Sequence, residues 1–130
     1  MKIKIGIIGT GNISNSHVLG FKNHPKAEIV AICDKRRRTV ERKAARWGID
    51  RIYKNYHDLL NQPDIDAVVI LTPHHLHAPI TIAAAETGKH ILVEKPIAVS
   101  LEEADQMIRA TNKAGVFLMV AENQVFHPPT

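Results

Sequence analysis

The sequence predicts an α/β fold in which a doubly wound, mostly parallel, six-stranded sheet carries helices on both faces. Two observations support this. Short apolar runs alternate with amphipathic or alanine-rich stretches along all 130 residues, and the apolar runs are nearly continuous. Continuous apolar strands are buried on both faces, which is typical of a parallel sheet covered by helices. Right-handed crossovers leave few topologies, of which the order 3-2-1-4-5-6 suits six strands best.

Each element follows from its own local pattern. The apolar runs predict strands at residues 2–8, 28–33, 51–53, 66–71, 90–93 and 116–121. Helical spacing predicts helices at residues 12–21, 39–47, 57–61 and 79–87, and a further helix that opens at a Ser100–Glu103 capping box and ends at Gly115. The last helix is expected to direct five side chains to the core, namely Leu101, Ala104, Met107, Ile108 and Ala114. We also expect Trp47, Cys33 and Met119 to be core residues.

Composition narrows the class of protein. The chain is 45% hydrophobic and 23% charged, within the range of ordinary globular domains. No apolar run approaches the roughly 20 residues that a membrane helix needs. The chain enters its first expected strand without a leader-like segment, and the lone Cys33 cannot form an internal disulfide. We therefore expect a cytoplasmic protein with no membrane partner.

The stretch Gly9-Thr10-Gly11-Asn12-Ile13-Ser14 lies between the first expected strand and the first expected helix. In that context Gly-x-Gly-x-x-small is the fingerprint of a dinucleotide-binding Rossmann domain. Gly9 permits the tight turn, Gly11 lets a pyrophosphate approach the backbone, and Ser14 is small enough for helix packing. Free amides and the helix dipole would hold the phosphates, so Gly9, Gly11, Asn12 and Ile13 are expected cofactor contacts.

Asp34 strengthens this interpretation. It directly follows the second expected strand, twenty positions beyond Ser14, where a carboxylate can accept hydrogen bonds from the adenosine ribose. The carboxylate would repel a 2′-phosphate and so favours NAD, whereas the basic run from Lys35 to Arg38 would attract one, which leaves NADP open. We expect Asp34, Lys35 and Arg38 to contact the cofactor. The alternative is that the glycines only turn the chain and Asp34 caps the next helix.

The positive charge of the chain is local. Residues 35–46 contain seven Lys or Arg and one Glu. Such a run could contact nucleic acid phosphates, but its only aromatic neighbour, Trp47, falls on the apolar face of the expected helix. A solvated helix face explains the run better, and we expect no nucleic-acid partner.

Residues 70–98, ILTPHHLHAPITIAAAETGKHILVEKPIA, closely resemble the central stretch of the Gfo/Idh/MocA oxidoreductases. In that family a Thr-Pro ends the fourth strand, a His follows, and the fifth strand ends in Glu-Lys-Pro. The matching residues are Thr72, Pro73, His77, Glu94, Lys95 and Pro96, while His74 stands where the family often has Asn.

The resemblance implies an NAD(P)-dependent oxidoreductase that transfers hydride between nicotinamide and a sugar, cyclitol or related carbonyl or alcohol. It also implies that Lys95 is catalytic and that Thr72, Pro73, His74, His77, Glu94, Lys95 and Pro96 line the cofactor crevice. Full-length members continue into a second domain, so we expect residues 1–122 to form the dinucleotide-binding domain and 123–130 to begin a linker. This chain alone would then bind NAD without turnover, and the full-length form would more readily form a homo-oligomer.

Two alternatives remain beside this interpretation. The chain could be a nucleotide-sensing module without catalysis. The His74-His75-x-His77 cluster could suggest a metal, but zinc needs four ligands, or three plus water, and no Cys, Asp or Glu lies nearby in sequence. We therefore expect no metal.

Overall fold

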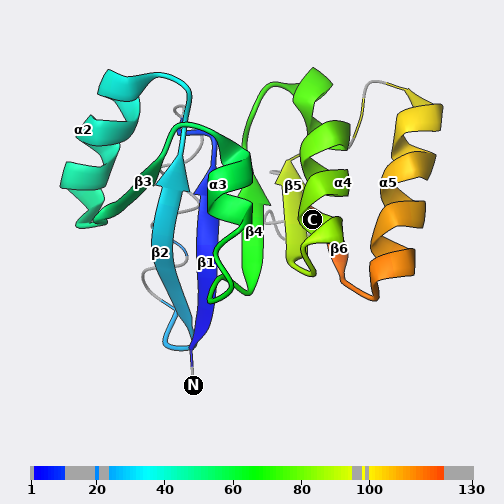
Figure 1. The fold of residues 1–130 in the computed structure, drawn as a ribbon, viewed down its shortest axis with the longest axis horizontal. Coiled ribbons are helices and arrows are strands. Elements are labelled where there is room, and N and C mark those ends of the chain that lie inside the picture. The colour runs from blue at the N-terminus through cyan, green and yellow to red at the C-terminus, as the bar shows by residue number, and fades with distance from the viewer. Residues whose placement is uncertain (1, 11–19, 21–23, 95–97, 99, 122–130) are drawn as a thin grey trace, which may run out of the picture.

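The computed structural model describes residues 2–10, 20, 24–94, 98 and 100–121. Six strands alternate with helices along this part of the chain, and all strand arrows point the same way (Figure 1). The strands are β1 (Ile3–Ile8), β2 (Ala27–Cys33), β3 (Arg51–Tyr53), β4 (Ala67–Ile70), β5 (His90–Glu94) and β6 (Leu118–Ala121). The helices are α2 (Arg37–Trp47), α3 (Tyr56–Leu60), α4 (His77–Glu86) and α5 (Leu101–Ala114), with a 3₁₀ turn η1 (His74–Leu76) before α4.

The six strands form one sheet in the order β3-β2-β1-β4-β5-β6, and every neighbouring pair is parallel. This confirms the predicted fold class. From β1 the strands β2 and β3 are added on one side of the sheet, and β4, β5 and β6 are added on the other side. In a doubly wound sheet, ligands bind in the crevice beyond the carboxyl ends of the strands at this switch point, here between β1 and β4. The expected helix at 12–21 and the expected linker at 123–130 lie outside the described residues.

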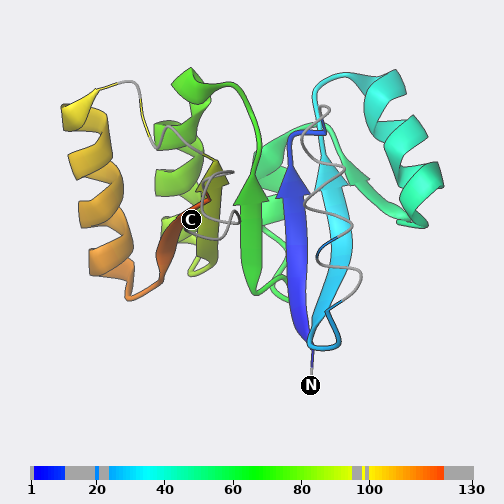
Figure 2. The same cartoon turned by 180° about the vertical axis from the view of Figure 1, so that it is seen from behind.

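Alternate side chains of the central strands point to opposite faces of the sheet and pack in two separate hydrophobic cores. Ile8, Cys33 and Ile70 belong to a core completed by α3, α4 and α5. Ile7, Ile32 and Val69 belong to a core on the other face, completed by α2. Figure 1 shows α3 and α4 in front of the sheet, and the reverse view in Figure 2 brings β4, β1 and β2 to the front. Helix α2 therefore packs on one face of the sheet, and α3, α4 and α5 pack on the other, as predicted.

Local signals place the helix ends close to where the sequence predicts them. In α2 the buried residues are Val40, Ala44 and Trp47, the stripe that the spacing indicates. The Ser100 hydroxyl accepts a hydrogen bond from the Glu103 amide at 3.1 Å, which caps α5. Helix α4 begins at His77, two residues before the predicted start, because a proline is tolerated in the first helical turn.

The expectation that α5 buries a broad apolar face is wrong. Met107 is fully buried, but Leu101 is 91% and Ile108 46% exposed, and Ala114 is exposed as well. The helix lies at the margin of the sheet and packs along α4 (Figure 1), so only a narrow stripe through Met107 and Thr111 is covered. Met119, expected in the core, is 63% exposed because β6 is an edge strand.

Candidate nucleotide-binding site

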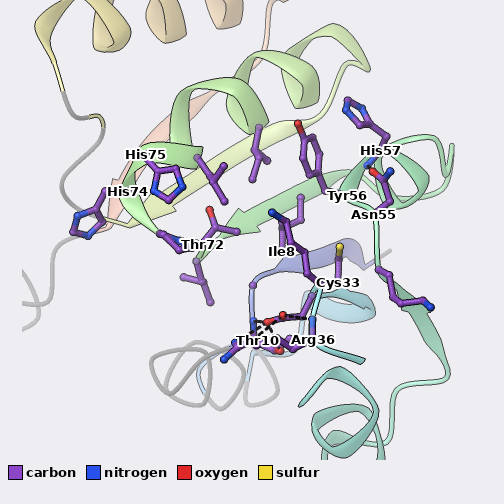
Figure 3. A pocket seen from close by; sticks show the side chains of 18 residues that line it. Ile8, Thr10, Cys33, Arg36, Asn55, Tyr56, His57, Thr72, His74 and His75 are labelled. Carbon is purple, nitrogen blue, oxygen red and sulfur yellow. Dashed lines mark hydrogen bonds and ion pairs between the residues drawn. The ribbon is translucent and has the colours of Figure 1, made fainter. Parts of the chain in front are cut away.

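A cleft of about 1070 Å³ opens at the carboxyl ends of β1, β2 and β4. Three groups of residues line it, together with Ile80 of α4. The groups are the end of β1 with its turn and the end of β2 with residues 34–36, the segment from 54 to 57 after β3, and the segment from 71 to 76 after β4. In Figure 3, His74 and His75 stand on one side, Asn55 and His57 on the other, and Thr10 and Arg36 below. A cleft of this size, at this position in a parallel sheet, is where α/β proteins bind ligands.

Gly9 lies where β1 meets β4, and its backbone conformation requires glycine. Its φ is +101°, and a Cβ there would come within 2.7 Å of the Leu71 carbonyl carbon and 2.9 Å of the Thr72 amide nitrogen. Its own amide donates to the Cys33 carbonyl at 2.8 Å. The backbone of the turn is therefore packed directly against the backbone of the segments that follow β2 and β4.

Asp34 follows β2 and joins this turn to the start of α2. Its Oδ2 accepts hydrogen bonds from the amide and the hydroxyl of Thr10, at 2.9 and 2.8 Å. Its Oδ1 accepts the amide of Arg36 at 2.9 Å. The side chain is only 8% exposed. The carboxylate therefore points toward the glycine turn and also accepts the amide of Arg36, the residue that precedes α2.

The Arg36 guanidinium completes the surroundings of this carboxylate. Its Nε donates to Oδ1 at 3.1 Å and its Nη2 donates to Oδ2 at 2.9 Å. Burial alone would raise the pKa of Asp34, but the hydrogen bonds from Arg36 and Thr10 outweigh it and hold that pKa well below its ordinary value. Asp34 is therefore a carboxylate at physiological pH.

Cys33 lies beside this site but is chemically inert. Burial, together with the negative charges of Asp34 and Asp58, raises the pKa of its thiol to about 12. A thiol that stays protonated is a poor nucleophile, and Cys33 packs in the core as predicted.

The segment after β4 places a second group of polar side chains at the cleft, including Thr72 and His74. The Thr72 hydroxyl is buried and has no hydrogen-bond partner among the described residues, although Thr72 lines the cleft. The Thr72 carbonyl is paired with His77 Nε2 at 3.0 Å. His77 itself is fully buried and does not line the cleft. The His74 ring stands edge-on to His77, with centroids 5.6 Å apart, while His74 and His75 line the cleft.

The structure thus brings together six of the predicted site residues, namely Gly9, Asp34, Lys35, Thr72, Pro73 and His74. Arg38 is exposed on α2 and does not line the cleft. Glu94 ends β5, is 7% exposed and likewise does not line it. Five further predicted residues lie outside the described part of the chain: Gly11, Asn12, Ile13, Lys95 and Pro96.

Several lining residues are absent from the sequence prediction. Thr10 occupies the variable position of the Gly-x-Gly motif, and Arg36 entered the prediction only as a member of the basic run from Lys35 to Arg38. Asn55, Tyr56 and His57 carry no such signal. They reach the cleft because β3 runs parallel to β2, so the turn that follows β3 lies at the carboxyl-terminal edge of the sheet, beside the end of β2.

No described helix is long and apolar enough to cross a membrane. Likewise, no three His, Cys, Asp or Glu side chains within the described ranges are grouped so that they could hold a metal ion.

The sheet order, the glycine turn and the acidic residue after β2 define the class of this protein: it is a dinucleotide-binding Rossmann domain. The model of the Gfo/Idh/MocA family, described as an oxidoreductase family with an NAD-binding Rossmann fold, matches residues 3–122. The chain belongs to that family, as the resemblance in residues 70–98 predicted.

Individual relatives agree with this assignment. The myo-inositol 2-dehydrogenase of Thermotoga maritima is 34% identical over 95% of this chain. The WlbA dehydrogenase of Bordetella pertussis, solved with NADH and UDP-GlcNAcA, is 36% identical over 93% of the chain, with a TM-score of 0.90. A biliverdin reductase from Synechocystis, solved with biliverdin and NADP⁺, is 27% identical over 91% of the chain, with a TM-score of 0.86. The chain spans 37% of the length of each of these three proteins.

Proposed function

We propose that this chain is the cofactor-binding part of an NAD(P)-dependent dehydrogenase or reductase whose substrate is a sugar, a cyclitol or a related alcohol or carbonyl compound. Residues 1–122 are assigned to the dinucleotide-binding domain. The substrate class is proposed from the family and from relatives that act on myo-inositol or bind a nucleotide sugar. We further propose that it works in the cytoplasm, as the free Cys33 suggests.

One observation carries the cofactor assignment. The buried carboxylate of Asp34 is held against Thr10, next to a glycine turn whose backbone has no room for a side chain. A dinucleotide needs both features together: bare peptide for its pyrophosphate and an acceptor pair for its adenosine ribose. The Thr72 hydroxyl, farther along the cleft, has no hydrogen-bond partner within the described part of the chain and offers a third polar contact to a bound molecule.

These residues fit a nicotinamide dinucleotide, which when bound supplies the hydride acceptor or donor. Gly9 and Thr10 would lie along its phosphates, Asp34 beside the adenosine ribose, and Thr72, Pro73 and His74 toward the other half. Lys95 is proposed as the catalytic residue, hydrogen-bonding the substrate oxygen and stabilising the charge that develops there. Lys95, Pro96, Gly11, Asn12 and Ile13 enter this proposal from the sequence alone.

Titration with NADH tests the cofactor assignment. The Asp34→Asn variant should bind NADH roughly ten- to a hundredfold more weakly, because a hydrogen bond to a charged group is worth about 1.5–3 kcal/mol. Asp105→Asn is the matched control, because it removes an exposed carboxylate from α5. Wild-type protein that binds no nicotinamide nucleotide, or equal NADH affinity in the two variants, would refute the assignment.

Catalysis is tested separately, in the protein that carries this chain, by following NADH absorbance with a panel of sugars and cyclitols. Lys95→Met should lower turnover by about a hundredfold or more, the scale of a lost hydrogen-bond donor to the charge that develops on the substrate oxygen, and leave NADH binding intact. If no panel member is oxidised or reduced although NADH binds, the chain is better described as a nucleotide-sensing module.

A further inference from the structure

His77 closes the turn between β4 and α4. The segment from 71 to 76 forms one wall of the cleft, and each of its residues lines the cleft. His77 is the next residue along the chain and is fully buried. Its Nε2 lies 3.0 Å from the Thr72 carbonyl oxygen, and because a carbonyl only accepts, Nε2 carries the proton and donates it. One buried side chain therefore joins the end of this wall to its beginning.

The backbone bond inside the wall does not reach Thr72. The Leu76 amide donates to the Pro73 carbonyl at 2.9 Å, which shapes only the 3₁₀ turn. On the side of β1, the Thr72 amide nitrogen lies against Gly9, where a Cβ would come within 2.9 Å of it. Thr72 is therefore held from one side by the glycine turn and from the other side by His77.

The His77 ring also supports the most exposed part of the wall. The His74 ring stands edge-on to it, with centroids 5.6 Å apart, an arrangement that aromatic pairs favour. His74 is exposed, so on its own it would occupy several rotamers, and the contact with a buried ring restricts them. Thr72 and His74 lie on the same side of the cleft (Figure 3), the side to which the proposed function assigns the nicotinamide half of the cofactor.

We propose that His77 is a positioning residue. From beneath the cleft it holds residues 72–74 in the geometry that receives the nicotinamide half of the dinucleotide, and it does so without touching the ligand. A wall that is already ordered loses less conformational freedom when the ligand binds, so the contact is expressed as affinity. This inference rests on the proposed cofactor function. It replaces the direct cofactor contact that the sequence analysis expected of His77.

Titration of three His77 variants with NADH tests the proposal. The amide nitrogen of a glutamine can stand about where Nε2 stands, so His77→Gln should bind NADH within about twofold of wild type. His77→Asn is one methylene too short, and His77→Phe keeps a ring without the donor. Both should bind NADH roughly three- to tenfold more weakly, the range of one lost hydrogen bond.

Titration with 5′-AMP separates positioning from a general loosening of the cleft. This probe occupies only the end of the site at Asp34, so His77→Asn and His77→Phe should bind it within about twofold of wild type. His90→Phe is the matched control, because His90 accepts the Phe117 amide at 3.0 Å at the amino end of β5, away from the cleft. It should leave the affinity for NADH unchanged. Melting curves verify that each variant is folded.

The outcomes distinguish the two proposals. If wild-type protein binds neither NADH nor 5′-AMP, the proposed function fails and this inference falls with it. Where wild type binds NADH, the role of His77 alone is overturned by any of three results: variants that all bind NADH equally, a parallel loss of NADH and 5′-AMP, or a loss in His77→Gln as large as in His77→Asn. A loss confined to NADH and restored in His77→Gln supports it.

Discussion

Gly9 lies against the backbone of Leu71 at the carboxyl end of the sheet, with no room between them for a single methyl group. A Cβ on Gly9 would stand 2.7 Å from the Leu71 carbonyl carbon and 2.8 Å from its oxygen. Neither atom belongs to a side chain that could rotate away. The first turn is thus locked to β4, and the amide of Leu71 in turn donates to the Ile8 carbonyl.

Gly9→Ala should lower the free energy of unfolding by about 3 kcal/mol, because a left-handed backbone strain and an overpacked contact add together. Gly48→Ala is the control: Gly48 also has a positive φ, of 71°, but a Cβ there meets nothing within 4 Å. It should cost only about 1–2 kcal/mol. Urea unfolding of both variants measures the difference, and equal losses would show that the contact with Leu71 does not matter.

The charge of Asp34 should make stability depend on pH. Its pKa is lowered in the folded protein, so below the ordinary Asp pKa of about 3.9 the unfolded chain takes up the proton first. The contribution of the charged group is therefore fully present near pH 7 and is lost as pH falls below about 4. Relative to Asp34→Asn, wild-type protein should be most favoured near neutrality, and the gap should narrow in acid.

Urea midpoints of wild type and Asp34→Asn at pH 7, 5, 4 and 3 measure that gap. Asp105→Asn, which breaks only an exposed i,i+4 pair with Arg109, should differ from wild type by less than about 0.5 kcal/mol at every pH. A gap between wild type and Asp34→Asn that stays constant from pH 7 to 3 would contradict the assigned role of the charge.

Lys89 is a buried cation at the opposite end of the sheet. It is 4% exposed, and its Nζ donates to the carbonyls of Gln62 at 2.8 Å and Ile65 at 2.9 Å. Burial lowers its pKa. Lys89→Met should reduce the free energy of unfolding by about 2 kcal/mol, because the Ile65 carbonyl loses the Lys89 donor and the Gln62 carbonyl keeps only the Ile65 amide, at 3.3 Å. Lys113→Met, on the exposed end of α5, should change it by less than about 0.5 kcal/mol. Chemical denaturation that finds the two variants alike would disprove this.

The Ser100 cap should govern the start of α5. Ser100→Ala removes the acceptor for the Glu103 amide and should cost about 1 kcal/mol, whereas Ser100→Asp restores an acceptor and should recover most of that loss. Thermal unfolding of the two variants measures the effect. Equal melting temperatures would mean that the amide finds another partner.

The sequence accounts for most of the secondary structure because its signals are local. Apolar runs mark every strand, Gly48 and Gly115 end their helices in left-handed conformations, and the capping box marks the start of α5. The position of Gly9 follows from the Gly-x-Gly spacing of the sequence, whereas the backbone contact with Leu71 that excludes a Cβ there is tertiary. Burial was harder to predict: Leu101, Ile108 and Met119 are apolar but exposed, because the edge of the sheet leaves their faces uncovered by the described residues.

By itself the sequence determined the glycine turn, the acidic residue after β2 and the family, since each depends on local spacing or on a contiguous motif. It also predicted the strand order, because right-handed crossovers leave few topologies for alternating strands and helices. Only the tertiary structure decided what surrounds that acidic residue. Arg36 pairs with Asp34, Thr10 donates to Asp34 from the turn after β1, and residues 55–57, which follow β3, line the same cleft. Those contacts depend on how the turns that follow separate strands meet at one edge of the sheet, and on the side-chain rotamers there. Neither can be predicted from a short stretch of sequence.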